Sequence, residues 1–354
     1  MRAAWLVTLL LASSTALASA HVIVGVAEVD GDTTTLLSIP LSATLLSKGG
    51  DAQQVGTLLH PRGDSPIGVL VDDDRLAVVL PAHGDLVLKH LKTGEEHTLA
   101  TGLMRNQRPT LLTTTRGPTL VAVRAAGPAF DVVGIAPIND SAGVDVLVSI
   151  TSGWLSIVPV AAPTTALSTS TALLSFDAPT ARGGAQLKHL GSDGRLVDGV
   201  ELGTGIFRNG VMRTNGTLLI ERESDDGIGQ RRSSVLAVTD TLKRAKTLTT
   251  GLAGLSPVVA GARAAMSTGS KDGSILVDGG DGRGFVRWPG ARVGQARPQT
   301  ISDVGDVVVV VVLVARGQQL PSELWALTKQ GGRLLLAPTA GRVLTVYGVS
   351  GAAR

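Results

Sequence analysis

The sequence of 354 residues contains no cysteine. Disulfide bonds are therefore excluded, and a folded state must depend on the burial of apolar surface. The lipid anchor of bacterial lipoproteins is excluded as well, because that anchor is attached to a cysteine just after the cleaved leader peptide. If the protein is exported, we expect it to be released as a free chain and not as a lipoprotein.

Aromatic residues are scarce, and the excess of charge of one sign is small. Phe, Trp and Tyr make up 3% of the chain, and the formal net charge is +3 at pH 7. This weak basic excess does not indicate binding to nucleic acid or to an acidic membrane surface. The basic residues are not interleaved with aromatic ones either, so a stacking platform for single strands is missing. We therefore expect no nucleic-acid partner and a core of small aliphatic side chains.

Long apolar runs and helical periodicity are missing from the body of the chain. The run Val307–Val314 is far too short to cross a bilayer. No window combines apolar residues at helical spacing with helix caps. The 44 glycines and 16 prolines instead mark many turns. The sequence therefore predicts an all-β protein with no membrane span in the mature chain.

The first 20 residues have the pattern of a signal peptide. Arg2 provides the positive start, Trp5–Leu11 the apolar centre, and Ala18-Ser19-Ala20 a cleavage site of small residues. A retained membrane anchor fits less well, because Ser and Thr at positions 13–15 interrupt a short apolar run. We expect removal of residues 1–20, a single domain over residues 21–354, and a location in the periplasm or outside the cell.

The clearest architectural signal lies between Arg75 and Arg108, together with the run Val69–Asp72 just before it. Short apolar runs alternate there with turns such as His83-Gly84-Asp85 and Lys92–Glu95. The pattern predicts four antiparallel strands in a meander, which is the composition of one propeller blade. These strands are Val69–Asp72, Arg75–Leu80, Leu86–Leu91 and Glu96–Ala100.

Parts of this unit recur along the chain. The hexapeptide Thr101–Asn106 returns as Thr204–Asn209 and more weakly as Thr250–Gly254, at one or two periods of roughly 50 residues. The repeat predicts a single β-propeller of about seven four-stranded antiparallel blades. Six or eight blades remain open as alternatives, because the region Ala161–Gly184 is ambiguous.

The two ends of the chain are expected to meet. His21–Val29 and Thr35–Leu41 form a hairpin that lacks a strand before it, and the run Arg342–Val349 has no blade of its own. Pairing of this last strand with the N-terminal blade would close the ring and cover two otherwise exposed apolar faces.

The stretch Asp85–Leu99, DLVLKHLKTGEEHTL, resembles the repeat of bacterial TolB-like and WD-repeat-like β-propellers. In that repeat a strand, a polar-Thr-Gly turn and a second strand ending in Leu follow one another. The chain departs from the family where Asp72-Asp73-Asp74 replaces the favoured Ser-Pro-Asp-Gly turn, and it has no counterpart of the N-terminal α/β domain of TolB. The resemblance implies a propeller fold and an exported, protein-binding role, without indicating a partner.

Arginine and amide side chains recur in the segments that lead from each outer strand to the next inner strand. Such loops converge near the channel mouth, so these residues would form a cationic rim suited to carboxylates or an acidic protein segment. The alternative is that they are turn residues of the repeat, with Arg covering apolar edges. The candidate binding residues are Arg105, Asn106, Arg108, Arg208, Asn209, Arg297 and Gln299.

His90 and His97 are a weaker candidate, for a metal. The four-residue turn Lys92–Glu95 would pair Leu91 with Glu96, and His90 with His97, across the hairpin. Zinc usually requires three protein ligands, so a solvated pair of imidazoles is the favoured interpretation. We predict no cofactor and no resident metal.

No catalytic residues stand out, because the chain lacks cysteine, a Gly-x-Ser-x-Gly elbow, a P-loop and a dinucleotide fingerprint. We expect a non-catalytic exported propeller that binds or scaffolds a protein or acidic polymer through its loop face. The alternative is an exported propeller enzyme that resembles a metal-dependent lactonase or a glycoside hydrolase. The sequence leaves the oligomeric state open.

Overall fold

The computed structural model shows an all-β protein, which confirms the predicted fold class at this level. No helix occurs in the described part of the chain, and within it no helix is long and apolar enough to cross a membrane. The predicted signal peptide lies outside the described residues except for Ala20. The structure describes residues 20–41, 51–104, 108–114, 117–126, 129–135, 144–150, 154–158, 160–161, 173–177, 185–190, 196–212, 217–225, 231–239, 244–250, 258–260, 263–279, 284–290, 292–302, 307–314, 322–338 and 341–350.

The described strands form seven sheets, nearly all of them antiparallel meanders. The first sheet, called here the terminal sheet, contains β29 (Arg342–Ser350), β1 (His21–Glu28), β2 (Thr33–Pro40) and β3 (Gln53–Leu59). The second sheet contains β4 (Ile67–Leu70), β5 (Arg75–Leu80), β6 (Asp85–His90) and β7 (Glu96–Ala100). The third contains β8 (Thr110–Thr114), β9 (Gly117–Ala126), β10 (Ala129–Ile135) and β11 (Val144–Ile150).

The remaining sheets follow in chain order. The fourth contains β12 (Trp154–Val158), β14 (Leu173–Asp177), β15 (Ala185–Leu190) and β16 (Leu196–Gly203). The fifth adds the short parallel β13 (Val160–Ala161) to β17 (Ile206–Met212), β18 (Leu218–Asp225), β19 (Arg231–Thr239) and β20 (Arg244–Thr250). The sixth contains β21 (Val258–Ala260), β22 (Arg263–Ser267), β23 (Ile275–Asp278) and β24 (Phe285–Trp288). The seventh, called here the valine sheet, contains β25 (Gln295–Ser302), β26 (Val307–Leu313), β27 (Ser322–Thr328) and β28 (Gly331–Leu336).

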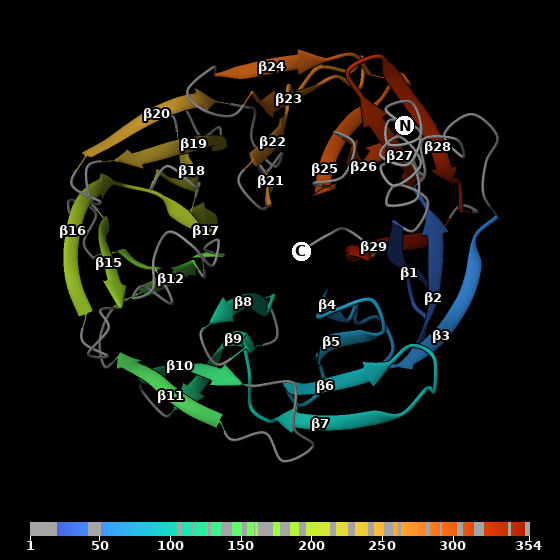
Figure 1. Cartoon of the computed structure of the whole chain (residues 1–354), viewed down its shortest axis with the longest axis horizontal. Helices are drawn as coiled ribbons and strands as arrows, with labels where there is room; N and C mark the ends of the chain where they lie inside the picture. The colour runs from blue at the N-terminus through green and yellow to red at the C-terminus, as the bar shows by residue number, and fades with distance from the viewer. Residues whose placement is uncertain are drawn as a thin grey trace, which may run out of the picture.

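The sheets follow one another around a central axis, with one end strand of each sheet nearest the centre (Figure 1). Strands β4, β8, β21, β25 and β29 border this centre, whereas β3, β7 and β16 lie at the periphery. Each inner strand except β17 has a hydrogen-bonded neighbour on one side only. Loops and side chains that enter or leave these inner strands are therefore the groups that the fold places near the axis.

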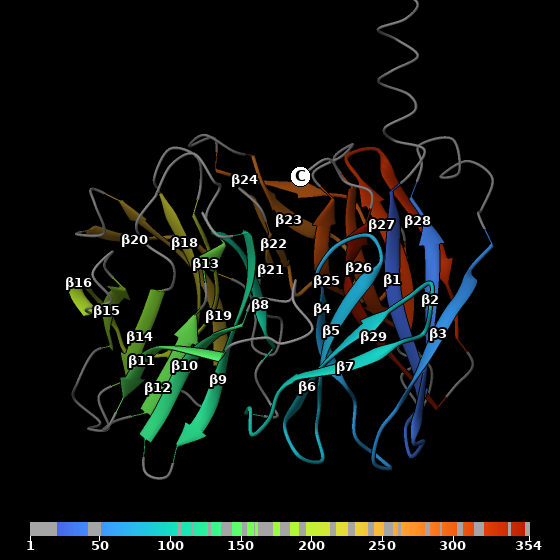
Figure 2. The same ribbon diagram turned by 60° about the horizontal axis from the view of Figure 1, so that its bottom comes forward.

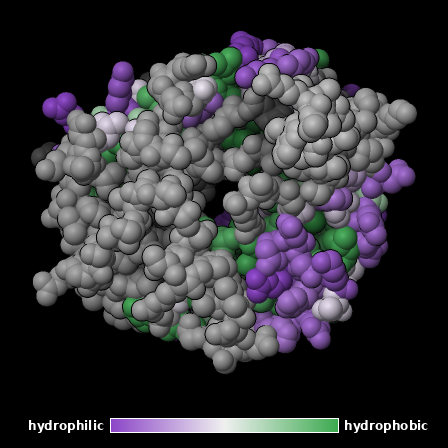
Figure 3. Space-filling model, viewed as in Figure 1, coloured by the Kyte–Doolittle hydropathy of each residue, from purple (hydrophilic) through white to green (hydrophobic). Residues whose placement is uncertain are grey.

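The second sheet has the four strands that the sequence predicts. Its first reversal, at residues 72–74, is an Asx-type turn, because Asp72 Oδ1 accepts the backbone N–H groups of Asp74 and Arg75. Burial opposes ionisation of Asp72, but hydrogen bonds to the Arg75 side chain and to these N–H groups lower its pKa. The second reversal uses Gly84 at φ +70°, in contact with the backbone of Leu103. Hydrophilic residues cover this sheet at the lower right of Figure 3.

The terminal sheet contains a strand that the sequence did not reveal. β3 pairs with β2 from Thr33–Leu59 to Ser38–Gln53. Only Leu58 is fully buried, Val55 and Gly56 are half-buried, and Leu59 remains 74% exposed. Because β3 is a peripheral strand with little of its surface buried, it lacks the apolar pattern from which strands are predicted.

The two ends of the described chain pair directly. β1 and β29 run antiparallel from His21–Ser350 to Glu28–Arg342, with one irregularity between Ile23 and Val24. Both ribbon views place red β29 beside blue β1 (Figures 1 and 2). β29 also contacts β4 of the second sheet and β25 of the valine sheet. The C-terminal strand therefore bridges sheets that are formed by opposite ends of the chain.

Tyr347, the single tyrosine of the sequence, is fully buried where β29 meets β4. Two glycines make room for its ring: a Cβ at Gly25 would lie 2.9 Å from Tyr347 Cε2, and one at Gly68 would lie 3.2 Å from Cδ1. The hydroxyl group donates a hydrogen bond to the carbonyl of Pro66 at 3.4 Å. Tyr347 thus packs against β1 of its own sheet and against β4 of the second sheet.

Burial raises the pKa of Tyr347 well above its ordinary value of 10.0, although the charge of Arg108 acts in the opposite direction. Above pH 10 the unfolded chain loses this proton and the folded chain keeps it. The contribution of Tyr347 to the free energy of unfolding should therefore be complete below pH 10 and fall as the pH rises further. An alkaline titration followed by phenolate absorbance is expected to show no ionisation before the protein unfolds. Ionisation near pH 10 in a protein that keeps its native circular dichroism would contradict this.

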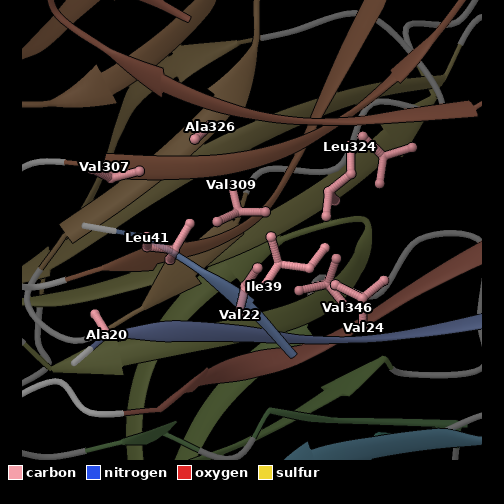
Figure 4. Packing of buried hydrophobic residues seen from close by; sticks show 11 residues of the cluster. Ala20, Val22, Val24, Ile39, Leu41, Val307, Val309, Leu324, Ala326 and Val346 are labelled. Carbon is pink, nitrogen blue, oxygen red and sulfur yellow. The ribbon is translucent and has the colours of Figure 1, made fainter. Parts of the chain in front are cut away.

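Strand β26 separates two hydrophobic clusters. Val307, Val309 and Val311 pack against terminal-sheet residues such as Val22 and Ile39, as the close-up in Figure 4 shows. The alternate residues Val308, Val310, Val312 and Val314 pack against the sixth sheet. Both faces of the strand are therefore buried, which explains why it reads as an unbroken apolar run.

Candidate binding cleft

A cleft of about 530 Å³ lies between the valine sheet and the terminal sheet. We call it the seam cleft, because it follows the boundary at which β29 meets β25 and β26. Its apolar lining comes from Val29, Val311, Leu313, Val343 and Leu344. Its polar side chains are Arg297, Gln299, Ser322 and Arg342.

The strand register explains why these polar residues meet. Arg297 is the third residue of β25 and lies opposite Val311, whereas Ser322 starts β27 opposite Leu313. Arg342 is the first residue of β29 and lies opposite Glu28 at the end of β1. The cleft therefore opens where two segments from outer strands, β24 and β28, reach the next inner strands. The binding rim was predicted on this same face, where segments from outer strands lead to inner strands.

The two cleft arginines are weakly neutralised. Among the described residues Arg297 has no ion-pair partner, and it is exposed. Arg342 Nη2 lies 3.9 Å from Glu28 Oε1. Because both of these side chains are largely exposed, water screens that pair strongly. The cleft thus combines two available guanidinium groups with an apolar lining.

A third arginine beside the cleft is neutralised by the protein. Arg292 Nε lies 2.9 Å from Glu323 Oε2, and the same carboxylate oxygen accepts a hydrogen bond from the Trp325 indole at 3.0 Å. Arg292 is 30% exposed and Glu323 14% exposed, so this pair is the better shielded one. The positive potential available to a ligand therefore comes from Arg297 and Arg342.

Two predicted rim residues, Arg297 and Gln299, line the seam cleft; both belong to strand β25, whereas Arg297 was expected in the segment before the strand. Strand β25 begins at Gln295, two residues before Arg297. Pro298 is tolerated because β25 is an end strand of its sheet. Gln299 is the extra residue of a β-bulge, since Pro298 pairs with Val310 and Thr300 with Val309.

Arg208 and Asn209 are likewise in a strand and not in a loop. They occupy β17, where Phe207 pairs with Arg222 and Gly210 pairs with Ile220. The two residues therefore stand opposite a single residue of β18, which is a second bulge in an inner strand. Arg105 and Asn106 lie outside the described residues. Arg108 is separate from the cleft and binds backbone carbonyls of β4 and β29.

The predicted pairing of His90 with His97 is wrong by register. Leu88 lies opposite His97, and Lys89 lies opposite Glu96. The reason is that Leu91 leaves the hairpin: it is buried, and its N–H donates to the carbonyl of Asp74 at 2.7 Å. The imidazoles still meet diagonally, with ring centroids 6.1 Å apart in an edge-to-face arrangement. No group of three or more metal-ligating side chains occurs within the described ranges.

Sequence reasoning missed Arg342 and Ser322 as cleft residues. Arg342 was assigned to the closing strand, and Ser322 had no distinguishing signal. One clue was present, because Arg342 and Arg297 each stand near the start of an inner strand that follows an outer one. The fold brings equivalent positions of neighbouring blades together. A search for charged residues at equivalent positions of the repeat would therefore have found Arg297 and Arg342.

Neither a protein-family model nor a curated protein sequence matches the chain. Solved structures do match over nearly the whole chain. A hypothetical selenium-binding protein from Sulfolobus tokodaii is 10% identical, with 94% of each chain covered and a TM-score of 0.57. A candidate 6-phosphogluconolactonase from Bacteroides uniformis is also 10% identical, with 92% of this chain and 99% of that chain covered and a TM-score of 0.53.

TolB from Acinetobacter baumannii matches as well, at 12% identity, with 92% of this chain and 82% of that chain covered and a TM-score of 0.45. The candidate 6-phosphogluconolactonase has a propeller-type fold, in agreement with the propeller predicted from the sequence. These likenesses concern the fold alone.

Proposed function

We propose that the protein is an exported, non-catalytic seven-bladed propeller that binds an acidic partner at the seam cleft. The seven described sheets are its blades, and pairing of β29 with β1 closes the ring. The observation that carries the proposal is the pair Arg297 and Arg342, held by two different sheets over a shared apolar lining. A protein or polymer segment that carries carboxylates beside aliphatic groups matches this chemistry.

The test is a binding titration of the full chain with a fluorescent peptide of glutamate and leucine residues. The double substitution Arg297→Gln and Arg342→Gln is expected to weaken binding by at least about tenfold, because each arginine contributes a charge-assisted hydrogen bond. Binding to the unsubstituted protein should also weaken with added salt. The melting temperature should change little, since neither arginine has a close partner in the described structure.

The matched control removes two exposed lysines outside the cleft, by Lys92→Gln and Lys246→Gln. Lys92 is 77% exposed with its nearest carboxylate oxygen at 3.5 Å, and Lys246 is exposed on β20. This control should bind the peptide as the parent does. Equal weakening in the control and in the cleft variant would show nonspecific attraction and refute the cleft as the site.

The alternative is an exported propeller enzyme, resembling a metal-dependent lactonase or a glycoside hydrolase. The candidate 6-phosphogluconolactonase among the similar structures shares the fold with this chain. Metal analysis of the purified protein, followed by a hydrolysis screen with lactones and glycosides, separates the two functions. Stoichiometric metal together with turnover would favour the enzyme; acidic-peptide binding without turnover favours the binding protein.

A further inference from the structure

Arg108 connects three sheets through one guanidinium group. The residue stands just before β8 of the third sheet, and its Nε donates a hydrogen bond to the carbonyl of Gly68 in β4 at 2.7 Å. Its Nη2 donates to the carbonyls of Val346 and Tyr347 in β29, at 3.1 and 2.8 Å. Strands β4, β8 and β29 all border the central axis (Figure 1). The guanidinium therefore lies among the inner strands, and Arg108 is not one of the residues that line the seam cleft.

These contacts use only part of the donor capacity of Arg108. A guanidinium has five N–H groups, and three hydrogen bonds from Nε and Nη2 are formed here. Within the described structure Nη1 has no hydrogen-bond partner, and no carboxylate pairs with Arg108. Neutral carbonyls satisfy donors, but they do not supply the compensating negative charge that a cation partly removed from water requires.

The surroundings of Arg108 strengthen this demand for an anion. Burial among protein atoms lowers the pKa of its guanidinium, which nevertheless stays protonated at neutral pH. The residue is still exposed to solvent. Because its Nε and Nη2 pack against the backbone of β4 and β29, an anion that reaches the guanidinium from solvent meets the charge in a medium of lower effective dielectric constant than bulk water.

A purely structural role accounts for Nε and Nη2 but not for the remaining donors. The hydrogen bonds by which Arg108 connects β4 and β29 do not involve Nη1. We propose that Nη1 of Arg108 forms an axial site for a small oxyanion, which binds through one oxygen of a carboxylate or phosphate group. This site goes beyond the proposed binding of an acidic partner at the seam cleft and is independent of it.

The test uses the full chain with its arginines labelled with nitrogen-15. The Arg108 Nε–H resonance can be identified in the unsubstituted protein by its contact with Gly68. Phosphate and acetate are titrated separately, with chloride added to hold the ionic strength constant. The proposal expects a saturable shift of the Arg108 side-chain signals with at least one of these anions. The titration in which the shift saturates tells whether the site prefers phosphate or a carboxylate. If the Arg108 signals shift only linearly with concentration in both titrations, the proposal is overturned.

Two variants separate this site from the cleft. Arg108→Lys keeps a positive charge, but a lysine cannot donate hydrogen bonds to the three carbonyls and bind an anion as well. This variant should therefore bind the oxyanion at least about tenfold more weakly. The variant with Arg297→Gln and Arg342→Gln should retain the Arg108 shift in full. If the shift disappears in that variant, the axial site is refuted and the anion resides in the cleft. If the shift persists while peptide binding is unaffected by the cleft substitutions, the proposed function fails and the axial site stands.

Discussion

Deletion of residues 342–354 is expected to abolish cooperative folding of the whole protein. The deletion removes β29 and with it the ladder from His21–Ser350 to Glu28–Arg342. It exposes terminal-sheet residues that pack on Val346, and it leaves Nη2 of Arg108 without its two acceptors. The loss of one large buried side chain already costs about 3–5 kcal/mol, and whole domains are stable by only about 5–15 kcal/mol. Loss of the entire strand should therefore exceed the available stability.

Thermal unfolding followed by circular dichroism and calorimetry measures this effect. The control is deletion of residues 351–354 alone, which leaves β29 complete and should melt as the parent does. A synthetic peptide of residues 342–350 added to the larger deletion should restore a transition in proportion to its concentration. A truncated protein that stays compact and melts at the parental temperature would show that the fold does not depend on this strand.

The second large effect is expected at Tyr347. Tyr347→Ala should lower the free energy of unfolding by about 3–5 kcal/mol, as for other large aromatic side chains in cores. Tyr347→Phe keeps the ring and loses only the hydrogen bond to Pro66, so it should cost about 0.5–1.5 kcal/mol. Denaturant unfolding of the two variants measures the difference. Equal costs would mean that the hydroxyl group, and not the ring in its glycine-lined space, makes the main contribution.

The glycine that faces Tyr347 provides an independent test of the same space. A Cβ at Gly68 would lie 2.5 Å from the backbone carbonyl oxygen of Ala77, which cannot move without distorting β5. Gly68→Ala should therefore cost about 1–3 kcal/mol. The matched control is Gly56→Ala in β3, where the nearest atom is Lys89 Cε at 3.3 Å and no backbone atom lies within 4 Å. The control should be close to neutral.

Strands with a buried apolar pattern could be predicted from the sequence, and strands without one could not. The four strands of the second sheet were predicted within a few residues, because apolar runs and Gly turns alternate there. Strand β3 was missed because its position at the periphery demands little burial. The apolar pattern of a strand reflects how much of the strand is buried, and not whether it pairs with a neighbour.

The candidate site was predictable in its chemistry but not in its geometry. Arg297 and Gln299 were found because Arg and amide residues recur before inner strands. The position of Arg297 inside β25 was missed, because proline beside polar residues is typical of a loop, whereas here a bulge accommodates them. The pairing of His90 with His97 failed for a related reason, since nothing local shows that Leu91 is withdrawn into the core. Both errors come from contacts between segments distant in sequence.

The position of β26 between two clusters has a consequence for the order in which the protein can fold. Val309 packs on Val22 and Val24, which were synthesised almost three hundred residues earlier. Contacts of such high sequence separation make folding slow, because a long loop must close before they form. The apolar face of the earliest strand therefore stays uncovered until nearly all of the polypeptide has emerged. A chain with this contact order depends on being kept from self-association during synthesis, and a chaperone that shields short valine-rich segments would supply that protection.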